Sequence, residues 1–219
     1  MSGLFSHLLA FPVVVVEGDP REFPADLSPL HADEAAMMRK AVDKRRREFT
    51  AARVFARRAY ESLGGTDDIS IVHDDDRAPI WPAGFVGSIT HTHTWCAVAM
   101  ARSTDVRAVG IDVERELPLE EKLWDSVCTP RDLEWLRSLP EAQRGPAGKA
   151  LFSAKECAYK AQYLITKKFL GFQAMSVVVE GDRWTATFEQ EAGEFQVGHE
   201  LTGTLCRAPG LIATAITLA

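Results

Sequence analysis

Short apolar runs bounded by turn residues predict strands in this chain, and longer stretches with apolar residues three and four apart predict helices. Strands are predicted at 8–17, 68–74, 106–114 and 210–219, with a strand pair in 84–101 and a hairpin in 174–190. Helices are predicted at 31–41, 43–63, 119–127, 130–138 and 149–166. The segment 140–149 is rich in Gly and Pro and is predicted to be a loop.

Each half of this pattern consists of helices that can pack on several mostly antiparallel strands, which indicates an α+β fold. The halves are similar in size and plan, although they share no obvious sequence repeat. The break between them falls in 101–106, "ARSTDV". We therefore expect two similar lobes, an N-terminal lobe at 1–104 and a C-terminal lobe at 105–219.

Composition narrows the class of protein. The net charge of −6 argues against a nucleic-acid binder, because such proteins are usually basic. The segment 43–58, "DKRRREFTAARVFARR", is nevertheless strongly basic, which favours a small polyanionic ligand. No apolar run is long enough to span a membrane, and the first residues resemble a strand more than a signal peptide. The four cysteines form no C-x-x-C pair, so we expect free thiols and a cytoplasmic location.

Two acidic residues in "AVGIDVE" are candidates for a metal site. Strand residues two apart share a face, so Asp112 and Glu114 lie together, with Gly110 beside them leaving room for an approaching group. Carboxylate oxygens suit Mg²⁺, which binds one or two carboxylates together with substrate phosphates. The alternative is an exposed strand with solvated acids, which a D-x-E tripeptide alone does not exclude.

The helix predicted at 149–166 carries an unusual stripe. Helical spacing brings together Phe152, Glu156, Tyr159, Lys160 and Tyr163. A glutamate among aromatic residues needs a partner, either a metal ion or a cation such as the lysine four residues on. The simpler alternative is a surface ion pair of the i,i+4 type.

The basic helix suggests a phosphate site. Helical spacing puts Arg46, Arg53 and Arg57 on one shoulder of an apolar stripe, and guanidinium groups bind phosphates in bidentate fashion. A solvated basic face is the alternative, and it suits Arg47 and Arg58 better. In "SITHTHTW", His91 and His93 share a strand face; no third zinc ligand is evident nearby, so a phosphate contact or a structural role is expected instead.

Together these segments resemble the 4′-phosphopantetheinyl transferases, in particular the monomeric two-lobed class that includes the enterobactin-synthetase and surfactin-type enzymes. The resemblance rests on "KRRREFTAAR", "WPAGFVGSITHT", "VGIDVE" and "FSAKECAYKA". D-x-E alone is a weak signal, but D-x-E followed about 40 residues later by F-S-x-K-E-x-x-Y-K-A is specific. Outside residues 44–172 the resemblance is one of general plan.

The resemblance implies transfer of the phosphopantetheine arm of coenzyme A to a serine of an apo carrier protein, with release of adenosine 3′,5′-bisphosphate. It also implies two lobes related by pseudo-twofold symmetry, with coenzyme A and Mg²⁺ in the cleft between them. The N-terminal lobe would hold the nucleotide, and the C-terminal lobe would hold Mg²⁺ and the catalytic residues. The enzyme is expected to act as a monomer, without nucleic acid or membrane partners.

The same resemblance assigns roles to individual residues. The residues expected to contact coenzyme A are Arg53, Arg57, Arg77, Ser88, His91, Lys155 and Lys160. The expected Mg²⁺ ligands are Asp112, Glu114 and Glu156. The expected catalytic residues are Glu156, Lys160 and Asp112, with Glu156 as the candidate general base and Lys155 beside it keeping it ionised.

Two other functions would use the same residues. A Mg²⁺-dependent hydrolase would split the coenzyme A pyrophosphate with water, and a non-catalytic protein would only bind coenzyme A. Lys167 and Lys168 are candidates for steering an acidic carrier protein toward the cleft. The sequence does not select among fatty-acid, polyketide, peptide-synthetase and siderophore carriers, and it assigns no role to His93 or Cys157.

Overall fold

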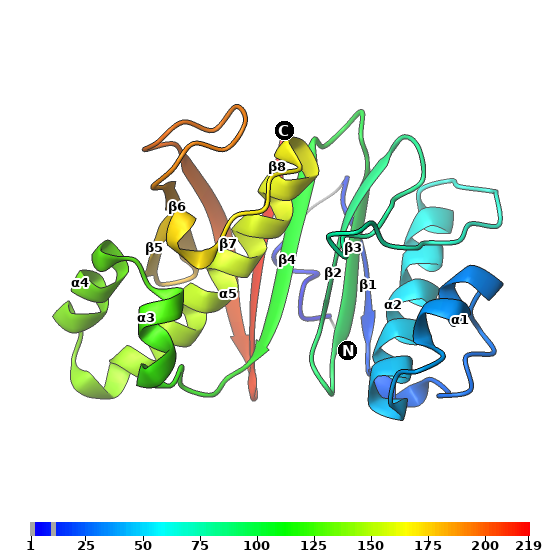
Figure 1. The fold of residues 1–219 in the computed structure, drawn as a ribbon, viewed down its shortest axis with the longest axis horizontal. Coiled ribbons are helices and arrows are strands. Elements are labelled where there is room, and N and C mark those ends of the chain that lie inside the picture. Colours follow the sequence, from blue (N-terminus) through cyan, green and yellow to red (C-terminus); the bar gives the residue numbers. More distant parts are fainter. Residues whose placement is uncertain (1–2, 10–11) are drawn as a thin grey trace.

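The chain folds into two antiparallel sheets with helices packed on them, in a computed structural model that describes residues 3–9 and 12–219 (Figure 1). The first sheet has the order β1-β3-β2 and the second the order β4-β8-β7-β6-β5. The strands are β1 (Val14–Gly18), β2 (Phe85–His91), β3 (Cys96–Arg102), β4 (Ala108–Arg115), β5 (Met175–Glu180), β6 (Arg183–Phe188), β7 (Glu200–Ala208) and β8 (Leu211–Leu218). The predicted α+β, two-lobed fold is confirmed.

One long helix covers each sheet (Figure 1). The α-helices are α1 (Ala32–Met38), α2 (Asp43–Ser62), α3 (Trp124–Val127), α4 (Pro130–Ser138) and α5 (Glu141–Thr166). Short 3-10 helices span Pro20–Glu22, Glu121–Leu123 and Phe172–Ala174. None of the helices in the described part of the chain is long and apolar enough to cross a membrane.

The period of two along the strands explains why the two sheets share a core. In β3, Val98 and Met100 face α2, whereas Ala97 and Ala99 face a central apolar cluster. The central cluster also contains the odd-numbered residues of β4, namely Val109, Ile111 and Val113. The even-numbered face of β4 is therefore left to meet α5.

The two sheets meet where β2 lies beside β4 (Figure 1). Two side-chain hydroxyl groups of β2 bridge this junction in place of a backbone ladder. The Oγ of Ser88 accepts a hydrogen bond from the Ile111 N–H at 3.1 Å, and the Oγ1 of Thr90 accepts one from the Val113 N–H at 2.9 Å. The junction is thus held by polar side chains that lie next to the acidic face of β4.

The predicted loop at 140–149 is wrong, because α5 begins at Glu141 and continues through Pro146. Packing explains the difference. A Cβ on Gly145 would lie 2.7 Å from Pro118, and one on Gly148 would lie 3.3 Å from Leu119. Gly145 and Gly148, which the sequence pattern suggested would break the helix, therefore allow the preceding segment to approach α5. Here tertiary contact outweighs local helix propensity.

The strand predicted at 68–74 is also absent; the structure has only an isolated bridge between His73 and Pro79 there. Charged side chains replace strand partners, because the N–H of Ile71 donates to Glu34 and its carbonyl accepts from Arg53. The first strand was predicted at 8–17 but begins at residue 14, and residues 5–9 form a turn. Residues 10–11 of the predicted strand lie outside the described part of the chain. The single helix predicted at 119–127 is instead a short 3-10 helix followed by α3. The sequence pattern also missed the strand β7.

Candidate active site

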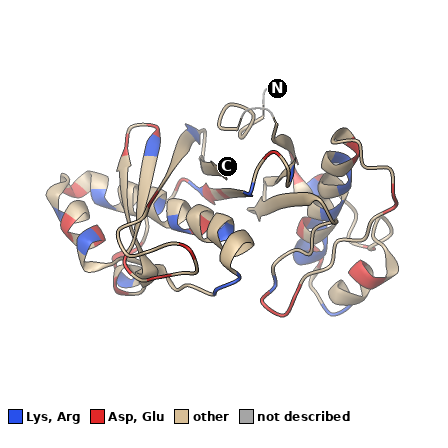
Figure 2. Ribbon diagram, turned by 90° about the horizontal axis from the view of Figure 1, so that it is seen from above, with Lys and Arg blue, Asp and Glu red and all other residues tan. Residues whose placement is uncertain are grey.

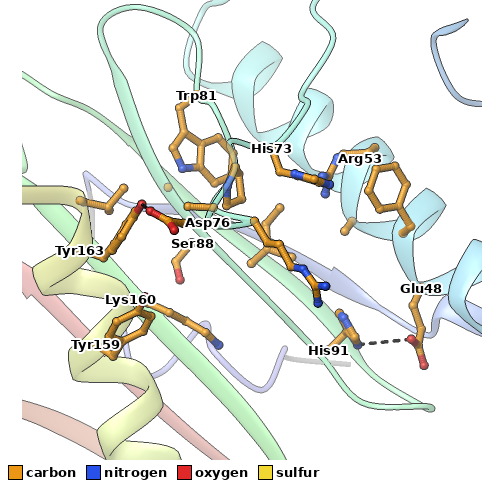
Figure 3. Close-up of a pocket in the computed structure, with 18 of the residues that line it drawn as sticks. Glu48, Arg53, His73, Asp76, Trp81, Ser88, His91, Tyr159, Lys160 and Tyr163 are labelled. Carbon is orange, nitrogen blue, oxygen red and sulfur yellow. Dashed lines mark hydrogen bonds and ion pairs between the residues drawn. The ribbon is translucent and has the colours of Figure 1, made fainter. Parts of the chain in front are cut away.

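A cavity of about 590 Å³ lies where α2, β2 and α5 come together, which is a volume typical of small-molecule sites (Figure 3). The loop between α2 and β2 forms a further wall. The polar residues that line the cavity are Arg45, Glu48, Arg53, His73, Asp76, Arg77, Ser88, His91, Tyr159, Lys160 and Tyr163. Cationic side chains from both halves of the chain therefore face one space.

Arg53 is held in the cavity wall by its surroundings. Its Nε donates to the carbonyl of Ile71 at 2.6 Å, and its guanidinium lies 3.9 Å from the centre of the Phe49 ring. Burial lowers the pKa of Arg53 to about 10, so the side chain is still charged at neutral pH. The Nε–H of this charged, buried guanidinium is already bonded, which fixes its orientation. Its remaining N–H groups are well suited to bind an anion.

Arg45, Glu48 and His91 form a second polar group on the cavity wall. The Nη1 of Arg45 lies 2.7 Å from the Nε2 of His91, and the Nδ1 of His91 lies 3.6 Å from a Glu48 oxygen. Burial, together with the Arg45 charge, lowers the pKa of His91 to about 4, so the ring is neutral at pH 7. The sequence prediction missed Arg45 and Glu48, although the i, i+4, i+8 spacing of Arg45, Phe49 and Arg53 could have revealed this face.

Arg57 does not line the cavity. Its Nη1 instead lies 2.9 Å from Glu34, which is fully buried, and its Nη2 donates to the carbonyl of Pro29. A buried carboxylate needs such a partner because ionised groups lose their hydration on burial. The structure therefore separates Arg57 from Arg53, although the sequence grouped them.

Arg77 and Ser88, which the sequence predicts to contact coenzyme A, both line the cavity. Arg77 lies in a tight turn with a φ of 65°. The hydroxyl of Ser88 accepts from the β4 backbone and can still donate its own proton. The contacts of both residues with a ligand stay predictions.

Asp112 is the centre of a buried hydrogen-bond network on β4. One of its oxygens lies 2.8 Å from the Lys160 Nζ, and the other accepts from the Ser153 hydroxyl at 2.9 Å. Thr90 donates to it from β2 at 3.3 Å. Burial opposes the charge of Lys160, but Asp112 and Glu156 outweigh it and raise the pKa of Lys160. Lys160 is therefore a firmly charged group at the cavity edge.

Gly110 serves a purpose other than the one predicted. A Cβ at this position would lie 2.2 Å from the carbonyl oxygen of Cys157 on α5. The missing side chain thus admits the helix backbone, not a metal ion or ligand. This close approach is what brings Lys160 within reach of Asp112.

Glu114 and Glu156 lie near Asp112 in a partly buried environment. Burial raises the pKa of both carboxyl groups, and the negative charge of Asp112 raises them further. Glu114 pairs with the Nζ of Lys149 at 3.2 Å. In the described part of the chain, no group of three or more His, Cys, Asp or Glu residues is arranged to hold a metal ion. The donor chemistry of the three acids suits a hard cation, whereas lysines hold two of these carboxylates in this structure.

Lys155 points away from the large cavity. Its Nζ lies 2.5 Å from Asp132 and donates to the carbonyls of Val127 and Phe172, both at 2.8 Å. Lys160, not Lys155, is the cation that acts on the pKa of Glu156. The expectation that Lys155 keeps Glu156 ionised is therefore wrong, because the Lys155 ammonium group is paired with Asp132 instead.

Glu156 and Lys155 instead line a smaller cavity of about 140 Å³ with Tyr159 and the segment 169–172. Cys157 is fully buried, and its Sγ donates to the carbonyl of Gly110. His93 is exposed and does not line either cavity. The structure thus gives Cys157 a packing position and leaves His93 without a role.

Family models match both halves of the chain. The 4'-phosphopantetheinyl transferase N-terminal domain matches residues 33–101, and the 4'-phosphopantetheinyl transferase superfamily matches residues 108–208. The first range contains α1, α2 and the strands β2 and β3, and the second contains β4 and α5. Both halves of the chain thus match the class of 4'-phosphopantetheinyl transferases.

Curated relatives agree over nearly the whole chain. The 4'-phosphopantetheinyl transferase Npt of Nocardia iowensis is 36% identical over 95% of this chain and 97% of its own length. PptT of Mycobacterium tuberculosis is 35% identical over 89% of this chain and 88% of its own. Enterobactin synthase component D of Escherichia coli is 30% identical over 92% and 93%. The chain therefore belongs to the 4'-phosphopantetheinyl transferases, and the resemblance seen in its motifs is confirmed.

Proposed function

We propose that this enzyme moves the 4′-phosphopantetheine arm of coenzyme A onto a serine hydroxyl of an apo carrier protein. The serine oxygen forms a new bond to the phosphorus that bears pantetheine, and the bond from that phosphorus to the bridging oxygen breaks. Adenosine 3′,5′-bisphosphate leaves, and the serine proton passes to a base. The observation that carries this proposal is the cavity that collects Arg45, Arg53, Arg77 and Lys160 from both halves.

The phosphates of coenzyme A account for these cations in a protein with a net charge of −6. In the proposal, Arg53 and Arg77 bind the nucleotide end, and Ser88 and Arg45 donate to its phosphates. His91, whose Nε2 accepts from Arg45, orients that guanidinium group toward them. Local cations inside an acidic protein indicate a site for a compact polyanion. Arg57, which pairs with Glu34, supports the site only indirectly by holding α1 against α2.

Asp112, Glu114 and Glu156 would hold Mg²⁺ in the loaded enzyme. A bound Mg²⁺ would neutralise charge on the pyrophosphate, as divalent ions do in phosphoryl-type transfer. The negative charge of Asp112 raises the pKa values of Glu114 and Glu156, which supports this part of the proposal, because clustered anions gain most from a cation.

Two residues of α5 serve the chemistry in this proposal. Lys160 lies at the cavity edge beside Asp112 and would stabilise charge that builds on the leaving bisphosphate. Glu156 would accept the serine proton. Its raised pKa makes it a better base than an ordinary glutamate, since efficient proton transfer needs a pKa near the working pH.

Analysis of the products separates this function from its alternatives. The enzyme is incubated with coenzyme A and Mg²⁺, with and without an apo carrier protein. A transferase releases adenosine 3′,5′-bisphosphate only when the carrier is present. Release of free 4′-phosphopantetheine without carrier would indicate a hydrolase, and no release in either case would indicate a protein that only binds coenzyme A.

Several finer points belong to the same proposal. The similarity to enterobactin synthase component D supports a carrier of siderophore assembly, and carriers of polyketide or nonribosomal peptide assembly fit the same chemistry. The four free cysteines fit a reducing cytoplasm. We also propose a monomer, with the nucleotide side in residues 1–104 and the catalytic side in residues 105–219, and with no nucleic-acid or membrane partner.

A further inference from the structure

A tyrosine hydroxyl connects the two halves of the chain at the wall of the large cavity. Tyr163 lies on α5 and is 5% exposed. Its hydroxyl donates to an Asp76 carboxylate oxygen at 2.6 Å (Figure 3). An Asp74 oxygen lies farther from the hydroxyl, at 3.5 Å. Among the described residues, no other hydrogen bond joins α5 to the loop between α2 and β2.

The partner of Tyr163 is a tight turn. The Asp74 N–H donates to the Ala78 carbonyl at 2.9 Å, and the Arg77 N–H donates back to the Asp74 carbonyl at 3.0 Å. The Asp74 side chain accepts from the Ala78 N–H at 2.8 Å. Arg77 has a φ of 65°, which is unfavourable for a residue with a Cβ. These bonds set the shape of the turn, but none of them sets its position relative to α5.

Arg77 is the free cation of this turn. Within residues 3–9 and 12–219, its guanidinium has no ion pair or hydrogen bond with another side chain or with the backbone, although it lines the cavity. The neighbouring Asp76 could neutralise it or repel a phosphate. The Tyr163 hydroxyl occupies one Asp76 oxygen and draws that carboxylate toward α5.

We propose that Tyr163 is a positioning residue for coenzyme A. Its hydroxyl holds the Asp76 carboxylate, fixes the turn 74–78 against α5 and so keeps the Arg77 guanidinium available to a phosphate in the cavity. This inference rests on the proposed function, because it requires that the cavity binds coenzyme A. In this role Tyr163 acts through Arg77 and not through contact with the reacting atoms.

Calorimetric titration of the intact enzyme with coenzyme A tests the proposal. Tyr163→Phe removes the hydroxyl and retains the ring, so the Kd for coenzyme A should rise about three- to tenfold, as expected for one lost hydrogen bond. The kcat at saturating coenzyme A and the KM for the carrier protein should be unchanged. Tyr60→Phe is the matched control, since Tyr60 is a buried tyrosine of α2 that does not line the cavity.

A double substitution shows whether Tyr163 acts through Arg77. Arg77→Ala should weaken coenzyme A binding by itself, and adding Tyr163→Phe to it should cause little further loss. A full additional loss would mean that the hydroxyl contacts the ligand directly, and the positioning role would be wrong.

The remaining outcomes are also decisive. If Tyr163→Phe binds coenzyme A as tightly as Tyr60→Phe and the wild type do, the inference fails while the proposed function stands. If kcat falls and the Kd does not change, Tyr163 is part of the chemistry and the inference also fails. If the wild-type enzyme shows no binding of coenzyme A, the proposed function fails first, and this inference fails with it.

Discussion

Arg53 and Arg57 are one helical turn apart on α2, yet their guanidinium groups have different partners. Arg53 faces the cavity and holds the carbonyl of Ile71. Arg57 neutralises the buried carboxylate of Glu34. Spacing along a helix predicts which side chains are neighbours, but it does not say which of them has a buried counter-ion from another element.

Replacement of these two arginines should therefore have different effects. Arg53→Ala should raise the KM for coenzyme A about tenfold or more, because it removes a charged hydrogen-bond donor. The effect should be smaller with 3′-dephospho-coenzyme A. Arg57→Ala should mainly lower the unfolding temperature, since it leaves Glu34 buried without its partner. Equal KM effects of Arg53→Ala on the two substrates would show that Arg53 does not bind the 3′-phosphate.

Among single residues, burial also affects the protonation of Glu156, the proposed general base. Burial raises its pKa, so the carboxylate becomes protonated at a higher pH than an exposed glutamate would. A base must be ionised to accept a proton, and kcat/KM should fall as the pH drops through this raised pKa. The profile for Glu156→Gln should lack that acidic limb, with a rate about 10²–10⁴-fold lower.

Mg²⁺ affinity separates the two roles of Glu156. If the Glu156→Gln rate returns fully when Mg²⁺ is raised, the residue is a metal ligand only. Loss of rate with unchanged Mg²⁺ affinity supports the base. Retention of the acidic limb in that variant would assign the limb to another group, such as Glu114.

At the scale of elements, α5 contributes residues both to the hydrophobic core and to the candidate active site. One side of it meets β4 across Gly110 and places Lys160 beside Asp112. Another side buries the pair of Lys155 and Asp132, whose oxygens also accept the N–H groups of Thr129 and Val177. The F-S-x-K-E-x-x-Y-K-A motif therefore combines a structural lysine, Lys155, with Lys160, for which we propose a role in the chemistry.

Lys155→Met should show this division. It removes the partner of the fully buried Asp132, and we expect the free energy of unfolding to fall by about 3–5 kcal/mol. The Kd for coenzyme A, measured well below the unfolding temperature, should change little. Denaturant titration and calorimetry measure the two quantities. An unchanged stability with a large loss of kcat would instead support the predicted contact of Lys155 with the leaving group.

The sequence predicted the elements that local pattern controls. The strands around Ser88 and Asp112 and the long helices were found because their apolar periods are regular. The extension of α5 through Pro146 and the missing strand at Ile71 were not, since they depend on partners far away in the chain. The acids and lysines proposed for the site were predicted from motifs, whereas Arg45 and the link from Tyr163 to Asp76 depend on three-dimensional contact.

At the scale of the whole molecule, charge bears on how a carrier protein approaches. Acidic and basic residues are interspersed over both halves (Figure 2), and the net charge is −6. Carrier proteins of this kind are generally acidic, so attraction needs a local basic surface. Lys167 and Lys168 directly follow α5, are exposed and precede Phe169, which is 76% exposed.

Removal of this basic pair should weaken carrier binding. Lys168→Ala with Lys167→Ala should raise the KM for the carrier several-fold at low salt, and added salt should reduce the difference. A matched control is Lys122→Ala with Arg183→Ala, which removes two exposed positive charges elsewhere. A KM that does not depend on salt, or an equal effect of both pairs, would mean that apolar contacts dominate docking.

In the function proposed above, the enzyme transfers the phosphopantetheine arm to a carrier serine, with Lys160 at the reacting end of the cavity and Asp112 beside it. The most direct test is the intact mass of an apo carrier protein after incubation with coenzyme A, Mg²⁺ and the enzyme. We predict a gain of about 340 Da, the mass of the covalently attached arm. The gain should be lost when the carrier serine is replaced by alanine and strongly slowed with Asp112→Asn. An unchanged carrier mass with the wild-type enzyme, or an equal gain on a carrier without that serine, would contradict the account.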